Sequence, residues 1–391
     1  MKSISWFFLL LMLQNNVFAQ IMDPAEKTPS SKGFRNNEMS VRSVKILPSK
    51  NPTKLNNLTQ VFEGTIYHER LKNYFESEKD IQYIILSKGD EILYRQNRLS
   101  YDPTPLGYSM SKSLVALTIG KALCDGKINN LNDKLAVYVS KLDNTSWGNS
   151  TIKDVLEMKS GAFDTEFNFG WRYDKWKEVH EGNYYSNNYT LDYYDQLRKY
   201  DAKSYKPGVV YKYSNFDTIA LSLIIENIAP EGFAKYFEEN IWKAARAQNS
   251  GAWIITKNSK QILAHTAFSA SPDDWIRIAN YVLDEREMDT CFGNFVKQAT
   301  TEQTKADRLT KSYGWQIWTN CIKGTDFYCF IGAYGQFLFS SPRTKLIMYT
   351  HSYEFGAVIG ARYFNEVSGI SSILKEIYYE EISKSSSASN N

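Results

Sequence analysis

The sequence predicts an α+β fold in which strands come from both ends of the chain and helices lie between them. Residues 81–98 have the pattern of a β-hairpin, with two β-rich runs joined across Lys88-Gly89-Asp90. Strand-like runs return only near residue 313, after a series of apolar helical patterns. We expect the early hairpin to join the late strands in one antiparallel sheet, with the central helices forming a second lobe.

The elements follow from local patterns. Apolar periodicity and end signals predict helices over 109–124, 151–161, 215–228, 232–245 and 271–284. The last has a Ser271 cap, Pro272 in its first turn and acidic residues at its positive end. Three strand-like runs and a closing helix follow, at 313–321, 327–340, 345–353 and about 363–380.

Composition limits the function classes. The chain has 391 residues, of which 43% are hydrophobic and 23% charged, with a net charge of +3. Acidic and basic residues are interspersed, which argues against nucleic acid as a partner. The four histidines lack metal-ligand spacing, so we expect no metal and no cofactor. The oligomeric state is left open.

The first residues indicate export. Lys2 precedes the apolar run Trp6–Leu13, and Val17-x-Ala19 resembles a cleavage site. We expect a signal peptide over 1–19 and a periplasmic or secreted protein, with no integral membrane segment after cleavage. After the signal peptide we expect an N-terminal arm or linker over 20–75 and a folded domain over 76–380, whose helical lobe covers about 125–255. A disordered tail is expected over 381–391.

Four cysteines permit disulfides in an exported protein. Cys321 and Cys329 flank a hairpin-like segment and can face each other. For these two, as for Cys124 and Cys291, buried free thiols are an equally weighted alternative.

The candidate chemistry starts at Ser109-Met-Ser-Lys112. Residues three apart share a helix face, so the hydroxyl and the amine can meet. A buried lysine of lowered pKa can take the proton of a serine nucleophile. Ser111, which spoils a G-x-S-x-G pattern, is interpreted as filler. The same S-x-x-K spacing at Ser150–Lys153 is interpreted as a helix cap, because the motif is short.

A second motif strengthens the interpretation of Ser109 and Lys112 as catalytic residues. Residues 206–215 place Pro-Gly before Tyr213-Ser-Asn215, at the entrance of an apolar helix. A phenol can share a proton with Lys112, and an asparagine amide can bind both the lysine and a substrate. A second Tyr-Ser-Asn at 185–187 lacks this context.

Together these motifs resemble the serine β-lactamase-related family, which includes class C β-lactamases, D-alanyl-D-alanine peptidases, family VIII-type esterases and 6-aminohexanoate-dimer hydrolases. The resemblance covers roughly residues 80–375. It is supported by three further landmarks, LEMKSGAF, AFSASPDDWIRIANYVL and YGWQIW. It implies a β-lactamase/transpeptidase-like fold and an acyl-enzyme mechanism with Ser109, Lys112 and Tyr213 as the catalytic residues.

The third family motif departs from the pattern. The family has Lys-Thr-Gly or His-x-Gly on the strand beside the serine. Lys159-Ser-Gly161 fits the letters but lies at a helix end, and alignment on Gly335-Gln336 places Phe330-Ile-Gly332 on the strand instead. By this resemblance the N–H groups of Ser109 and Ala333 form the oxyanion hole.

The remaining expected substrate contacts are Asn215, Gly332 and Tyr334. The aromatic stretch 161–194 is either a substrate wall or a loop packed by its own rings. Its candidate wall residues are Phe167, Trp171, Tyr173 and Trp176.

The missing strand cation favours a neutral substrate, because in the family that cation helps to hold a substrate carboxylate. We therefore expect a serine hydrolase acting on a small-molecule ester or amide. The alternatives are penicillin-binding or β-lactamase activity, and a catalytically silent binding protein on the same scaffold.

Overall fold

A computed structural model of the chain describes residues 42–99, 102–162, 192–255, 259–306, 310–333, 335–352 and 361–388. The signal-peptide prediction and the start of the arm lie outside these residues. So do the aromatic candidates between 163 and 191, the second Tyr-Ser-Asn, and Tyr334. No helix among the described residues is both long enough and apolar enough to cross a bilayer.

The main sheet confirms the expected α+β class. Its strands are β2 (Asn56–Asn57), β3 (Ile81–Lys88), β4 (Glu91–Asn97), β9 (Tyr328–Gly332), β10 (Gln336–Ser340) and β11 (Leu346–Ser352). Their order is β2-β4-β3-β11-β10-β9. The early hairpin joins the late strands as predicted, because β3 pairs antiparallel with both β4 and β11. Only the short β2 runs parallel to its neighbour.

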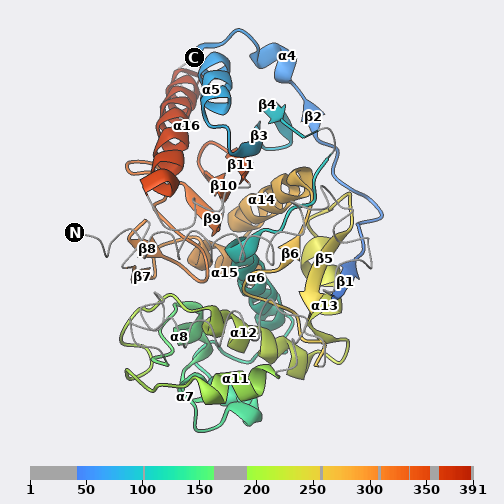
Figure 1. Ribbon diagram of the computed structural model, residues 1–391, viewed down its shortest axis with the longest axis vertical. Helices are drawn as coiled ribbons and strands as arrows, with labels where there is room; N and C mark the ends of the chain where they lie inside the picture. Colours follow the sequence, from blue (N-terminus) through green and yellow to red (C-terminus); the bar gives the residue numbers. More distant parts are fainter. Residues whose placement is uncertain are drawn as a thin grey trace, which may run out of the picture.

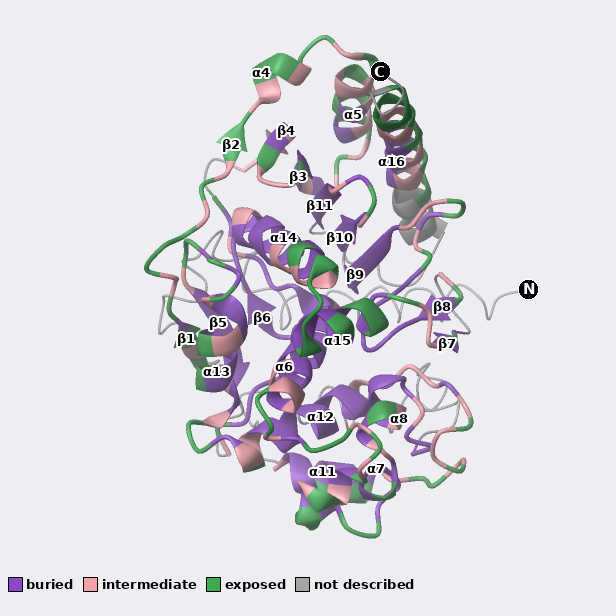
Figure 2. Ribbon diagram, turned by 180° about the vertical axis from the view of Figure 1, so that it is seen from behind, coloured by how far each residue is buried: buried purple, intermediate pink, exposed green. Residues whose placement is uncertain are grey.

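Helices cover both faces of this sheet (Figure 1). The helices that carry the site or flank the sheet are α5 (Ile66–Ser77), α6 (Ser111–Cys124), α14 (Pro272–Glu287), α15 (Cys291–Ala299) and α16 (Ala361–Ala388). Along β11, Leu346 and Met348 pack with α5 and α16, whereas Ile347 and Tyr349 pack with α14 and α6. Because side chains alternate along a strand, β11 contributes to two separate cores. Its ribbon is buried in Figure 2.

A group of helices at the other end of the molecule forms the second lobe (Figure 1). Its helical segments are η2 (Leu135–Val137), η3 (Ser140–Leu142), α7 (Ser146–Asn149), α8 (Ile152–Leu156), α11 (Tyr193–Lys199) and α12 (Asn215–Ile228). They are followed by α13 (Gly232–Phe237) and η4 (Glu238–Trp242). Thr151, not Ser150, caps α8, while the Ser150 hydroxyl donates to the carbonyl of Ser146.

The segment predicted as an arm or linker over residues 20–75 contains regular secondary structure from residue 42 onward. β1 (Arg42–Ile46) pairs with β5 (Gly251–Ile255), which also pairs with β6 (Phe268–Ser269). After β2, the short helix α4 (Thr59–Phe62) leads into α5, which packs on α16. Before α5 the segment lacks periodicity because β1, β2 and α4 have only two to five residues each.

Two of the three late strand predictions need correction. Residues 313–321 do not form one strand: β8 (Ser312–Tyr313) pairs with β7 (Thr304–Lys305), and Trp318 makes only isolated bridges, to Tyr313 and Cys329. Gln316 then has a φ of +57°, and its side-chain amide donates to the carbonyls of Val155 and Leu156. Residues 327–340 are not one strand but the hairpin β9–β10, which turns at Gly335 with a φ of +72°.

The closing helix is longer than predicted. α16 continues to Ala388, so residues 381–388, expected in a disordered tail, are helical. The serines of this stretch donate to carbonyls three or four residues earlier, as Ser385 does to Glu381. Lys384 also pairs with Glu380 one turn back.

Both cysteine pairs are disulfides. Cys321 bonds to Cys329, as the hairpin pattern allowed, and Cys124 bonds to Cys291, a pair that the sequence did not single out. The second bond joins the end of α6 to the start of α15.

Candidate active site

Ser109 lies in a sharp turn at the entrance of α6. It belongs to the short helix η1 (Tyr108–Met110). Tyr108 adopts a backbone φ of +46°, which residues other than glycine rarely adopt. Every residue from Pro105 to Gly120 is buried except Ser109, which is half-buried. The turn therefore presents one hydroxyl from an otherwise buried segment.

Lys112 lies directly behind that hydroxyl. Its Nζ is 3.0 Å from Oγ of Ser109 and donates to the carbonyl of His265 at 2.7 Å. The lysine is 1% exposed, and this burial holds its pKa well below the ordinary value. A neutral amine next to a serine hydroxyl can accept its proton.

The backbone around the serine is fixed by β6. The N–H of Gly107 donates to the carbonyl of Phe268, and the N–H of Phe268 donates to Oγ of Ser111 at 3.0 Å. The interpretation of Ser111 as filler, made from the sequence, is therefore wrong. The buried hydroxyl of Ser111 ties the start of α6 to the strand that precedes α14.

Tyr213 lies on a loop that brings its ring close to Lys112. Residues 158–162 run beside the segment that leads to Tyr213, and the N–H of Lys212 donates to the carbonyl of Met158 at 2.8 Å. Nζ of Lys112 lies over the ring of Tyr213, 5.1 Å from its centre. The structure thus brings together the three residues predicted to be catalytic.

Tyr213 is followed directly by helix α12, whose first turn is held by a cap and by buried hydrogen bonds. Ser214 caps the helix, and Asn215 is its half-buried first residue. Within the described part of the chain, the Asn215 side chain makes no hydrogen bond. Asp217 is buried and accepts from Trp147 and Ser160, and burial raises the pKa of its carboxyl to about 7.

The end of β9 reaches the nucleophile turn. A Cβ added at Gly332 would lie 2.3 Å from the carbonyl oxygen of Gly107, so only glycine allows this approach. Ala333 and Ser109 follow these two glycines closely. The backbone segments that carry the two predicted oxyanion-hole N–H groups therefore lie beside each other, and the oxyanion hole itself stays a prediction.

The strand position aligned with the family cation is occupied by an apolar side chain. Phe330 is 1% exposed and packs in the core that contains α6 and α14. Lys159, whose motif letters fitted, forms an ion pair with Glu157 at 2.8 Å instead.

Several contributions escaped sequence reasoning. The His265 carbonyl that accepts from Lys112 is a backbone group, which carries no sequence signal. Trp318, which stacks on Tyr213, lies in a run interpreted only as a strand.

Comparison with known proteins identifies the family of the chain. A family model for β-lactamase matches residues 104–357, which include Ser109, Lys112, Tyr213 and Gly332. The chain belongs to the β-lactamase family. This is a family of serine hydrolases, in agreement with the resemblance drawn from the motifs. No curated protein sequence matches the chain.

Solved structures of other proteins share its fold. One is from Bacillus anthracis and is described as a 6-aminohexanoate-dimer hydrolase. It has 17% identity and a TM-score of 0.71 over 89% of this chain and 93% of its own. EstCE1, a hydrolase with promiscuous acyltransferase activity, has 13% identity and a TM-score of 0.60 over 77% and 97%. The D-alanine carboxypeptidase AmpC from Burkholderia cenocepacia has 12% identity and a TM-score of 0.56 over 79% and 97%.

Proposed function

We propose that this β-lactamase-family chain hydrolyses a neutral ester or amide through an acyl-enzyme on Ser109. The observation that carries the proposal is the 3.0 Å contact between Oγ of Ser109 and Nζ of a buried lysine whose pKa is lowered. A permanently charged lysine would not accept a proton, whereas a desolvated one can.

The steps follow from this contact. Lys112, with Tyr213 beside it, takes the Ser109 proton while Oγ attacks the substrate carbonyl carbon. The N–H groups of Ser109 and Ala333 stabilise the oxyanion that forms. The tetrahedral intermediate expels the alcohol or amine, which receives the proton. A water then attacks the acyl-enzyme, gives its proton to the same base, and Ser109 leaves with a proton restored.

The neutrality of the substrate rests on Phe330. A buried phenyl ring cannot form an ion pair with a carboxylate. By the motif resemblance, Phe330 stands where family members that bind carboxylates have a cation. The names of two structural neighbours, a 6-aminohexanoate-dimer hydrolase and a hydrolase with acyltransferase activity, fit an amide or ester substrate.

Export is part of the proposal. Two disulfides favour an oxidising compartment such as the periplasm or the exterior. This agrees with the signal peptide expected over residues 1–19. N-terminal sequencing of the protein recovered outside the cytoplasm tests it, and a mature chain that begins at Gln20 is expected.

The substrate class is tested with a panel of p-nitrophenyl esters and short ω-amino-acid amides, with Ser109→Ala as the matched inactive variant. We expect turnover of a neutral member and none by the variant. Nitrocefin turnover exceeding that of every ester and amide would replace this proposal with β-lactamase activity. A folded protein that turns over none of them would support a binding protein.

A further inference from the structure

The ring of Tyr213 is held by other aromatic rings. It stacks on Trp318, with centroids 5.4 Å apart and planes 27° apart, and meets Tyr313 edge-on at 6.2 Å. Tyr313 in turn meets Trp318 edge-on at 4.8 Å. These three rings form a closed set in which each contacts the other two. Offset stacking and edge-to-face contacts are the arrangements that aromatic rings prefer.

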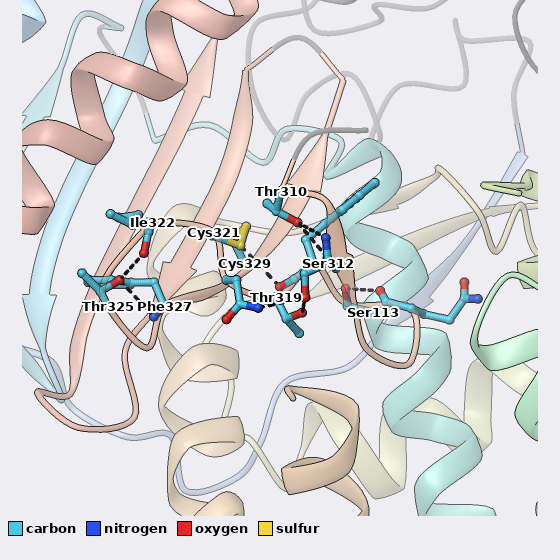
Figure 3. The surroundings of a disulfide bond; sticks show 12 residues. Ser113, Thr310, Ser312, Thr319, Cys321, Ile322, Thr325, Phe327 and Cys329 are labelled. Atoms are coloured by element: carbon cyan, nitrogen blue, oxygen red, sulfur yellow. Dashed lines mark hydrogen bonds between the residues drawn. A yellow bond between two sulfur atoms is a disulfide. The ribbon is translucent and has the colours of Figure 1, made fainter. Parts of the chain in front are cut away.

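Trp318 is itself fixed on the side of β9. Its N–H donates to the carbonyl of Cys329 at 3.2 Å, and the N–H of Cys329 donates back to the carbonyl of Trp318 at 2.9 Å. Cys321, three residues further on, is bonded to Cys329. Its sulfur lies 3.4 Å from the Trp318 carbonyl oxygen. The disulfide therefore closes the loop that begins three residues after Trp318, and Figure 3 shows this bond between Cys321 and Cys329.

The same segment is also tied to the nucleophile helix. The hydroxyl of Ser113, next to Lys112, donates to the carbonyl of Gln316 at 2.9 Å. In Figure 3, Ser113 and the Cys321–Cys329 bond lie on either side of Ser312 and Thr319. Trp318 is thus placed between an anchor on α6 and a covalent anchor on β9, and it is only 4% exposed.

We propose that Trp318 is a positioning residue that holds the phenol of Tyr213 against Lys112, and that the Cys321–Cys329 disulfide holds Trp318. The inference rests on the proposed function, because the position of Tyr213 matters only if that phenol carries protons. Trp318 has no chemistry of its own in the reaction. Its effect passes through the angle and distance at which Tyr213 meets the amine.

The first test replaces Trp318 by leucine or by phenylalanine. Misplacement of a reacting group by about 1 Å can cost about 100-fold in rate. We expect Trp318→Leu to lower kcat about 10- to 100-fold on a p-nitrophenyl ester, with KM changed less than about threefold. Trp318→Phe, which can still stack, should restore kcat to within about fivefold of wild type. Phe327→Leu removes another buried ring of the same core and should leave kcat unchanged.

A double-mutant cycle separates positioning from a general loss of structure. In a Tyr213→Phe background, Trp318→Leu should lower kcat no further, because the group it positions is gone. An equal fall in both backgrounds would mean that Trp318 acts by another route and would overturn the proposal. The pH profile of kcat gives a second readout, since Trp318→Leu should shift its limbs and Phe327→Leu should not.

The two disulfides supply a matched pair that does not depend on the folding of Trp318→Leu. In preparations shown by circular dichroism to be folded, Cys321→Ser/Cys329→Ser should lower kcat about tenfold or more, whereas Cys124→Ser/Cys291→Ser, although it loses more stability, should keep kcat near wild type. Cys124 lies twelve residues beyond Lys112, about 18 Å along the helix. Equal kcat values for the two double variants would contradict the role of the Cys321–Cys329 bond.

Failure of this inference is distinguishable from failure of the proposed function. If Ser109→Ala keeps full activity, the proposed function fails, whatever the Trp318 variants do. If Ser109→Ala is inactive and Trp318→Leu has wild-type kcat and pH profile, only the positioning role fails.

Discussion

The contact between Gly332 and Gly107 gives the sharpest prediction for a single substitution. In Gly332→Ala the new Cβ would lie 2.3 Å from the Gly107 carbonyl oxygen and 2.9 Å from Cβ of Gln336, whereas ordinary contacts begin at 3.4 Å. The oxygen belongs to backbone, so β9 and the nucleophile turn must separate by about 1 Å. That separation moves the Ala333 N–H away from the carbonyl that Ser109 attacks. We expect kcat to fall about 100-fold and stability to fall by about 1–3 kcal/mol.

The assay is steady-state hydrolysis of a p-nitrophenyl ester, together with urea unfolding of the same preparations. Gly293→Ala, in the first turn of α15, is the matched control. Its new Cβ would lie 2.2 Å from the carbonyl oxygen of Met288. It should lose a comparable amount of stability and keep its kcat. If Gly332→Ala retains more than about half of wild-type kcat, the oxyanion-hole assignment is wrong.

Three further predictions follow from burial, charge and the disulfides. Burial lowers the pKa of Lys112, so kcat/KM should fall as the pH drops below that lowered pKa. Lys112→Arg, whose guanidinium is always charged, should lose activity about 100-fold or more at every pH. An arginine variant with a wild-type pH profile would refute lysine as the base. The folded pKa of Asp217, about 7, lies above its ordinary value, so its contribution to stability is full below about pH 4 and is lost as the pH rises through about 7; the loss is up to about 4 kcal/mol. Urea unfolding from pH 4 to pH 8 should show this decline in wild type and a flatter curve in Asp217→Asn, and identical slopes would contradict it. Removing the Cys124–Cys291 bond, which spans 167 residues, should cost about 5 kcal/mol of unfolding free energy, and removing Cys321–Cys329, which spans 8, about half of that; the reverse order in thermal unfolding would argue against the loop-entropy account.

Local signals predicted the elements whose ends are decided locally. The helix at 215–228 has the predicted bounds, because Ser214 accepts from two N–H groups of its first turn. The same holds for the Ser271 cap of α14. Ser109 and Lys112 were found in the same way, since a spacing of three residues brings their side chains together across the junction of η1 and α6.

Elements decided by distant contacts were missed. The run 313–321 has strand composition, but Gln316 leaves the extended region to bind carbonyls of α8, about 160 residues away in sequence. The residues around the site show the same limit. The His265 carbonyl is placed by contacts distant in sequence, and Trp318 lies three residues before a disulfide whose formation the sequence left open.

The central claim is that Lys112 activates Ser109 as the nucleophile of this β-lactamase-family protein. The most direct test is intact-mass and peptide mass spectrometry after reaction with a fluorophosphonate. The account predicts one adduct per chain, located on Ser109, absent in Ser109→Ala and formed at least about 100-fold more slowly in Lys112→Arg. No adduct on folded wild-type protein, or an adduct that persists in Ser109→Ala, would contradict it.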